Sequence, residues 1–85
     1  MYLNIMNFFN FKNKIILITG SSGLIGKTIC RAFLNCGAIV YGIDIKKCKL
    51  QNKRYFHKKI NLKDNRKISK YINNLIAKNK KIDVI

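Results

Sequence analysis

The sequence contains no proline and no tryptophan, and only three acidic residues stand against 18 lysines and arginines. Lysine, asparagine and isoleucine are abundant instead, as coding bias in an AT-rich genome would produce. A net charge of +15 is typical of proteins that bind nucleic acids or anionic membranes. Because the lysines are scattered and form no single stripe, we predict no specific nucleic-acid partner. A basic nucleic-acid-associated protein is the alternative from a different functional class.

The residue patterns of metal sites and of disulfide frameworks are also missing. Cys30, Cys36 and Cys48 form no Cys-x-x-Cys pair, and His57 is the only histidine. We expect no metal site and no disulfide framework, and thiols of this kind fit a reducing cytosol. No apolar run approaches the ~20 residues that span a bilayer, and the first residues lack the charged region of a signal peptide. We therefore expect a cytoplasmic protein without a membrane partner.

The chain is long enough for one small domain. It has 85 residues, of which 48% are hydrophobic, a globular composition with room for only a thin core. Residues 1–13 alternate apolar residues with asparagine and form an irregular lead-in. Residues 14–85 carry the organised part of the sequence, without an internal repeat or a linker.

The most informative stretch joins an apolar run, Ile15–Ile18, to Gly20, Gly23 and Gly26. A strand that turns through glycines into a helix exposes backbone N–H groups at a helix N-terminus, where phosphate binds. The first glycine allows the tight turn, the second the approach of a pyrophosphate, and the third close packing of helix on strand. Ser22 is the expected N-cap of that helix. The stretch therefore predicts a dinucleotide-binding loop.

A P-loop is the rival interpretation of the same residues. Gly26-Lys27-Thr28 matches the end of Gly-x-x-x-x-Gly-Lys-[Ser/Thr], but the first glycine of that motif would have to stand at Ser21. Bulky Leu24 and Ile25 also lie where a P-loop wraps its phosphate. We therefore favour the dinucleotide loop and expect Lys27 to be a solvated helix residue.

Strands and helices alternate along the rest of the chain. Apolar periodicity predicts strands at 15–18, 38–43, 55–61 and 82–85 and helices at 24–36 and 64–80. Gly37 and Asp64 are placed to cap the first helix at its end and the second at its start. The expected apolar face of the first helix consists of Ile25, Ile29, Ala32, Phe33 and Cys36. The alternation predicts the N-terminal half of a three-layer, doubly wound parallel sheet with strand order 3-2-1-4.

The stretch Thr19-Gly20-x-x-Gly23-x-x-Gly26 resembles the cofactor loop of the short-chain dehydrogenase/reductase superfamily. The resemblance covers about Lys14 to Ile85, and the glycine spacing resembles the extended, sugar-nucleotide-modifying branch. It implies a Rossmann fold and an NAD(P)-dependent oxidoreductase of unknown substrate, homo-oligomeric as full-length members usually are. A sugar-nucleotide epimerase or dehydratase is the alternative within the superfamily.

The resemblance also implies the cofactor-binding positions, which are Gly20, Ser21, Ser22, Gly23, Leu24, Ile25, Gly26, Asp44, Ile45, Asn61 and Leu62. Asp44 ends the second strand and is expected to hydrogen-bond the adenosine ribose. Its charge would repel a 2′-phosphate, and Ile45 stands where an arginine would favour NADP, so we expect NAD in preference to NADP. Asn61 aligns with the aspartate that binds adenine in the family, but it lacks the charge.

The catalytic Tyr-x-x-x-Lys motif of the superfamily has a literal match from Tyr55 to Lys59. We reject this match because the stretch is a predicted strand, where residues four apart lie ~13 Å from each other instead of stacking. It also precedes the fourth strand, whereas the family's tyrosine, lysine and serine follow it. We assign no catalytic residue to this chain and expect a truncated member that is inactive alone.

Overall fold

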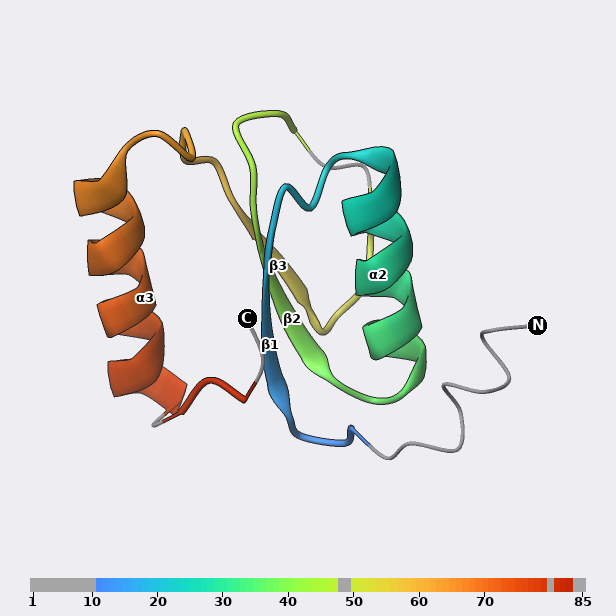
Figure 1. The fold of residues 1–85 in the computed structure, drawn as a ribbon. Coiled ribbons are helices and arrows are strands. Elements are labelled where there is room, and N and C mark those ends of the chain that lie inside the picture. The colour runs from blue at the N-terminus through green and yellow to red at the C-terminus, as the bar shows by residue number, and fades with distance from the viewer. Residues whose placement is uncertain (1–10, 48–49, 80, 84–85) are drawn as a thin grey trace.

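The structure, a computed structural model, describes residues 11–47, 50–79 and 81–83 and contains a parallel sheet between two helices (Figure 1). Its elements in chain order are β1 (Ile15–Thr19), α2 (Leu24–Asn35), β2 (Ile39–Ile43), β3 (Tyr55–Lys58) and α3 (Asn65–Asn79). Helix α2 covers one face of the sheet and α3 covers the other (Figure 1). The predicted three-layer α/β fold is confirmed. Among the described residues, neither helix combines the length and apolar composition that crossing a membrane requires.

The three strands lie in the order β1-β2-β3, and both pairings are parallel. Gly42 in the central strand is in register with Ile18 of β1 and with His57 of β3. This order agrees with the first three strands of the predicted 3-2-1-4 arrangement. All three strands therefore end at the same edge of the sheet, where β1 leads into the glycine loop.

The predicted fourth strand is not found in its described part, because Ile82 and Asp83 carry no strand assignment and 84–85 lie outside the described residues. Asp83 nevertheless donates its N–H to the carbonyl of Ile15 at 2.8 Å. Its carboxylate accepts the N–H of Ile15 at 2.7 Å. The chain thus returns to the edge of β1 where the predicted order places the fourth strand.

Alternation along the strands divides the core into two layers. The layer under α2 contains Ile16, Ile18, Cys30, Leu34, Ala38, Val40 and Tyr55. The layer under α3 contains Ile15, Leu17, Tyr41, Ile43, Ile60 and Leu75. Both faces of the sheet are covered, as the nearly continuous apolar strands require.

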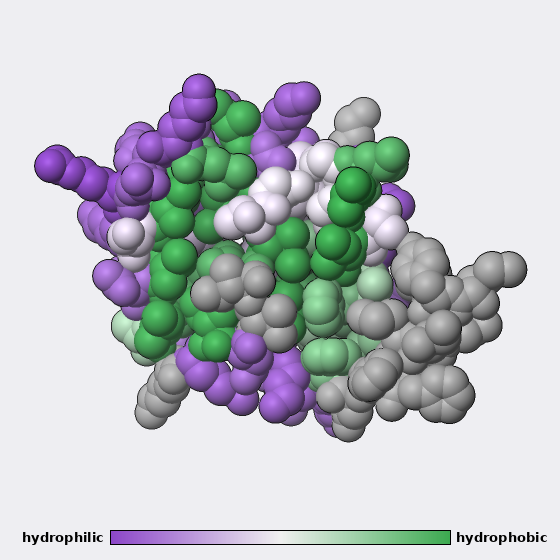
Figure 2. All heavy atoms as spheres, in the orientation of Figure 1, coloured by the Kyte–Doolittle hydropathy of each residue, from purple (hydrophilic) through white to green (hydrophobic). Residues whose placement is uncertain are grey.

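The buried face of α2 differs from the prediction. Ile25 and Ile29 are 76% and 39% exposed, whereas Cys30 and Leu34 are buried. The helix packs on β1 and β2, so its flank beyond β1 has no cover among the described residues. Figure 2 shows the apolar side chains that gather across this face of the molecule. The prediction is confirmed for Ala32, which is buried, and for Phe33, which packs against the core, and it is wrong for Ile25 and Ile29 because a fully covered helix was assumed.

Both helix caps expected at Gly37 and Asp64 are confirmed. Gly37 has φ +92°, and the N–H groups of Gly37 and Ala38 donate to the carbonyls of Leu34 and Phe33 in a Schellman motif. The carboxylate of Asp64 accepts the N–H of Lys67 at 3.1 Å. These caps stop α2 just before β2 and begin α3 after the turn that follows β3.

The third strand is shorter than predicted, because β3 ends at Lys58 and not at residue 61. Its last hydrogen bond to β2 runs from the N–H of Asp44 to the carbonyl of Lys58 at 3.2 Å. Beyond that point β2 has ended and offers no partner. The chain then buries Ile60 under α3 and turns toward Asp64.

Candidate functional site

The turn after β1 requires glycine at two positions, for two different reasons. Gly20 has φ +71°, a left-handed conformation that side chains disfavour, and its N–H donates to the carbonyl of Ile43 at 2.8 Å. A Cβ atom at Gly26 would collide with the carbonyl group of Gly20. Glycine at this position therefore lets α2 begin directly against the turn. The packing role predicted for Gly26 is confirmed.

The N-terminus of α2 has no side-chain cap. Its N-cap is Gly23, so the predicted cap by Ser22 is wrong. Ser22 stands one residue before the capping position, and its hydroxyl donates to the carbonyl of Lys46 at 2.9 Å instead. The first helical bond runs from the N–H of Lys27 to the carbonyl of Gly23 at 2.8 Å.

The backbone N–H groups of Leu24, Ile25 and Gly26 precede that first helical bond. No hydrogen bond to them is found within the described part of the chain. They lie at the positive end of the helix dipole, next to Gly23, which has no side chain and is exposed. An uncapped helix N-terminus of this kind binds anionic groups such as phosphate.

Asp44 lies directly beside this loop, as its position after β2 predicted. Its Oδ2 atom accepts the N–H of Ser22 at 3.1 Å, and its Oδ1 atom accepts the N–H of Lys46 at 3.0 Å. The hydrogen bond from Lys46 lowers the pKa of Asp44 most; partial burial opposes it, and the bond from Ser22 and the charge of His57 lower the pKa further. The structure therefore holds an ionised, oriented carboxylate against the glycine loop.

Three other predicted cofactor positions lie on the surface and take no part in the contact between Asp44 and Ser22. Ile45 follows Asp44 and is about half exposed. Asn61 and Leu62 lie in the turn between β3 and α3, where the Asn61 side chain accepts the N–H of Lys63 at 2.9 Å. In the described residues no hydrogen bond joins Asn61 or Leu62 to the loop or to Asp44. Their role as cofactor contacts stays a prediction.

Residues 16–85 match a protein-family model described as the NAD dependent epimerase/dehydratase family. The chain belongs to this family. The matched region begins in β1 and includes the glycine loop, Asp44 and the turn at Asn61. The resemblance to the short-chain dehydrogenase/reductase superfamily is thereby confirmed. A comparison of the sequence with curated proteins finds no match.

Solved structures of two dehydrogenases have the same fold as this epimerase/dehydratase family member. One is a short-chain dehydrogenase from Leptospira borgpetersenii serovar Hardjo-bovis with bound NAD+, with a TM-score of 0.80 and 23% identity over 99% of this chain. The other is the aldohexose dehydrogenase of Thermoplasma acidophilum, with a TM-score of 0.76 and 22% identity over 85% of this chain. The aligned regions are 32% and 28% of those chains, so this chain spans about a third of their length.

One polar cluster beneath the loop of this family member is not among the features predicted from the sequence. The hydroxyl of Tyr55 lies 3.0 Å from both Ser21 Oγ and His57 Nδ1. A Cβ atom at Gly42 would overlap the hydroxyls of Ser21 and Tyr55, so the glycine in β2 makes room for the cluster. The sequence did contain a signal, because a glycine inside an apolar strand often marks a close approach by another group. The predicted strand location of Tyr55 is confirmed.

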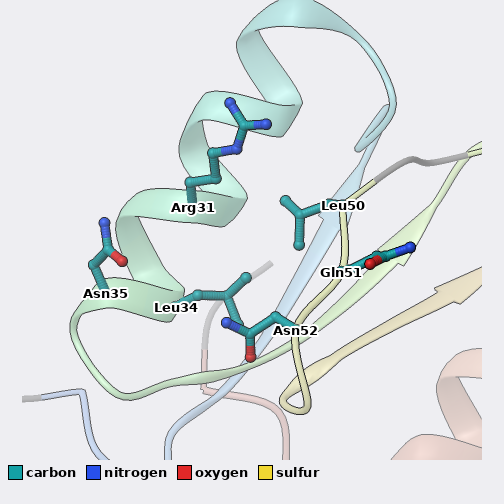
Figure 3. Close-up of a pocket in the computed structure, with 6 residues that line it drawn as sticks. All are labelled: Arg31, Leu34, Asn35, Leu50, Gln51 and Asn52. Carbon is teal, nitrogen blue, oxygen red and sulfur yellow. The ribbon is translucent and has the colours of Figure 1, made fainter.

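Two surface hollows lie on or near α2. A hollow of about 240 Å³ lies between the C-terminal half of α2 and residues 50–52, and none of its lining residues is a predicted site residue (Figure 3). Beside this hollow, the guanidinium of Arg54 donates hydrogen bonds to the carbonyl of Leu34 in α2 and to the carbonyl of Ala38 just before β2. A second hollow, of about 540 Å³, borders the glycine loop and is lined by Ile18, Thr19, Gly20, Gly23, Leu24, Ile25, Gly26 and Ile29. Only the second hollow adjoins the candidate site.

Proposed function

We propose that residues 14–85 form the dinucleotide-binding half of an NAD-dependent oxidoreductase of the short-chain dehydrogenase/reductase type. The observation that carries this proposal is the 3.1 Å contact between the Asp44 carboxylate and the N–H of Ser22. It joins a ribose-binding acid to a phosphate-binding loop that lies 22 residues away in the sequence. The family match and the fold of NAD+-bound and related dehydrogenases support the same conclusion.

The residues of the loop fit the phosphates of such a cofactor. The N–H groups of Leu24 and Ile25 would hold the pyrophosphate, with Gly23 leaving space for its approach. Each Asp44 oxygen already accepts one hydrogen bond and retains a lone pair for a ribose hydroxyl. Ile45, Asn61 and Leu62 would surround the adenine. When bound, the nicotinamide cofactor supplies hydride transfer, while this chain binds and orients it.

The choice of NAD over NADP follows from the charge of Asp44. Its carboxylate is ionised, and a 2′-phosphate on the ribose that it binds would bring two like charges together. Ile45 offers no compensating positive charge at the next position. Lys46 and Lys47 are exposed, so solvent and salt screen their attraction for a phosphate.

The rest of the catalytic machinery is expected from protein outside residues 1–85. The dehydrogenases of the same fold are about three times as long as the aligned region. We infer that the catalytic serine, the Tyr-x-x-x-Lys pair and the substrate pocket belong to that additional part. The complete protein would act in the cytoplasm on a small-molecule substrate, as a homo-oligomer.

A sugar-nucleotide epimerase or dehydratase is the second candidate, because the glycine spacing and the family description favour it. The structural neighbours are dehydrogenases and favour the first. Product analysis distinguishes the two. An oxidoreductase accumulates reduced nicotinamide in step with oxidised product, whereas net epimerisation or dehydration leaves the nicotinamide oxidation state unchanged.

A salt series tests the nucleic-acid alternative. Lys58, Lys59, Lys67 and Lys70 line one hollow of about 490 Å³ between β3 and α3, which would attract a phosphate backbone. We expect affinity for DNA and RNA to fall steeply with salt and to show no sequence preference. Tight, selective binding at physiological salt would favour the alternative.

Binding of NAD+ to protein with isotope-labelled glycine tests the proposed function. The experiment uses the full-length protein with assigned glycine amides; among the five glycines of residues 1–85, Gly23 and Gly26 lie at the proposed phosphate site. We expect NAD+ to shift these two signals and to leave Gly37, at the opposite end of α2, unchanged. Gly37 is thus an internal control. No saturable shift, or a shift of Gly37 as large as that of Gly23, would contradict the site.

A further inference from the structure

A buried hydrogen-bonded chain connects β3 to the glycine loop. Ser21 is 0% exposed and Tyr55 is 8% exposed. The Tyr55 hydroxyl donates to Ser21 Oγ at 3.0 Å and lies at the same distance from His57 Nδ1. These hydrogen bonds thus link His57 on β3, through Tyr55, to Ser21 in the glycine loop.

The tautomer of His57 gives this hydrogen-bonded chain its direction. A tyrosine hydroxyl has one proton to donate. With a protonated Nδ1, His57 donates to the Tyr55 oxygen and the Tyr55 proton goes to Ser21 Oγ; with a bare Nδ1, the Tyr55 hydroxyl donates to His57. The other ring nitrogen, Nε2, is buried and has no hydrogen-bond partner among the described residues. The histidine is therefore oriented by its bond to Tyr55.

The hydrogen-bonded chain adjoins the proposed dinucleotide site at two residues. Ser21 immediately precedes Ser22, whose N–H binds the Asp44 carboxylate. His57 lies opposite Gly42 in the register of the sheet, and Gly42 stands two residues before Asp44 at the same end of β2. Both the loop and the acid are thus coupled to the same polar chain.

We infer that Tyr55 is a positioning residue for the dinucleotide site: its hydroxyl, oriented by His57, fixes Ser21 and thereby the glycine loop. This inference rests on the proposed function of the loop. No contact of Tyr55 with the cofactor is implied, because its hydroxyl is enclosed by Ser21, His57 and the backbone at Gly42. The role requires the hydroxyl and not only the ring.

Tyr41 provides a matched control on the other face of the sheet. It is 5% exposed, and its hydroxyl accepts a hydrogen bond from Asn79 at 3.3 Å. Tyr41→Phe and Tyr55→Phe therefore each remove one hydroxyl from a buried tyrosine in a neighbouring strand. Loss of stability alone would act on both variants, whereas loss of loop positioning would act on Tyr55→Phe alone.

The experiment compares both variants in the full-length protein by NAD+ titration and by hydrogen exchange of the loop amides. We expect Tyr55→Phe to weaken NAD+ binding roughly three- to tenfold, the effect of one lost hydrogen bond. It should also speed exchange at Ser21 and Ser22, while Tyr41→Phe changes neither by more than about twofold.

Equal effects of Tyr55→Phe and Tyr41→Phe on loop exchange would overturn the positioning role, as would unchanged exchange in Tyr55→Phe. A parent protein that binds no NAD+ would contradict the proposed function instead, and loop exchange would still decide the role of Tyr55.

Discussion

Asp83 satisfies both backbone groups of Ile15 at the free edge of β1. Its N–H donates to the Ile15 carbonyl at 2.8 Å, and its Oδ2 atom accepts the Ile15 N–H at 2.7 Å. Lys81 lies 3.6 Å from the other carboxylate oxygen. A single residue therefore pairs, through its backbone and its side chain, with the first residue of the strand that leads into the glycine loop.

This contact predicts an acid-sensitive contribution to stability. The hydrogen bond from Ile15 lowers the pKa of Asp83 most, partial burial opposes it, and Lys81 and Lys14 lower it further. Because the pKa is lower in the folded state, this stabilisation is present above the ordinary aspartate pKa of about 4 and is lost as pH falls through the folded pKa.

Melting curves of the full-length protein between neutral and acidic pH measure this contribution. Asp83→Asn should lower the melting temperature at neutral pH and leave a shallower fall in acid. Lys81→Met retains the carboxylate and its bond to Ile15, so it should preserve most of the acid dependence. An unchanged acid limb in Asp83→Asn would show that the Ile15 contact contributes nothing to stability.

Two glycine substitutions separate folding from binding. Gly26→Ala places a methyl group against the Gly20 carbonyl and should destabilise the protein by about 1–3 kcal/mol or more. Gly23→Ala meets only one ordinary contact, at 3.4 Å from the same carbonyl, and its φ of −71° suits alanine. It should therefore keep its stability and lose affinity for NAD+ at least about tenfold.

Denaturant unfolding and NAD+ titration of the two variants check this separation. We expect the larger loss of stability in Gly26→Ala and a loss of binding without unfolding in Gly23→Ala. Normal NAD+ affinity in Gly23→Ala would mean that the phosphates do not approach the loop at this residue.

The sequence predicted features that depend on local geometry. The turn at Gly20, the cap at Gly37 and the position of Asp44 each follow from neighbouring residues and the parallel order of the strands. The cap predicted at Ser22 is wrong by one residue. Helix α2 begins at Leu24, as predicted, so its N-cap is Gly23. The Ser22 hydroxyl stands one residue before the capping position and donates to the carbonyl of Lys46 instead.

Features that depend on distant parts of the molecule could not be predicted in this way. The exposure of Ile25 and Ile29 is set by what lies beyond the edge of β1, which helical periodicity does not describe. The contact of Tyr55 with Ser21 spans 34 residues and requires the exact register of β3 on β2. Only Gly42 hinted at that contact.

The exposed flank of α2 predicts poor behaviour of the isolated chain. Ile25 and Ile29 border an apolar hollow, and β1 has no strand partner on its outer side among the described residues. We expect the 85-residue chain alone to show no dehydrogenase turnover and to be poorly soluble or molten.

Solubility and calorimetry of the isolated chain measure this expectation. Ile25→Lys should raise solubility, while the matched substitution Ile76→Lys on exposed α3 should raise it less. Turnover by the purified chain would contradict its dependence on further protein. A sharp cooperative melt of the parent chain would contradict the predicted instability.

The central claim is that Asp44 and the glycine loop form one NAD-binding site, and the relative affinity for NAD+ and NADP+ tests it most directly. In the full-length protein we predict tighter binding of NAD+, because the Asp44 carboxylate receives both ribose hydroxyls and repels a 2′-phosphate. Asp44→Ala should weaken NAD+ binding and reduce or remove the preference, whereas Asp64→Ala, which removes the cap of α3, should preserve it. Preference of the parent for NADP+, or an unchanged preference in Asp44→Ala, would contradict the account.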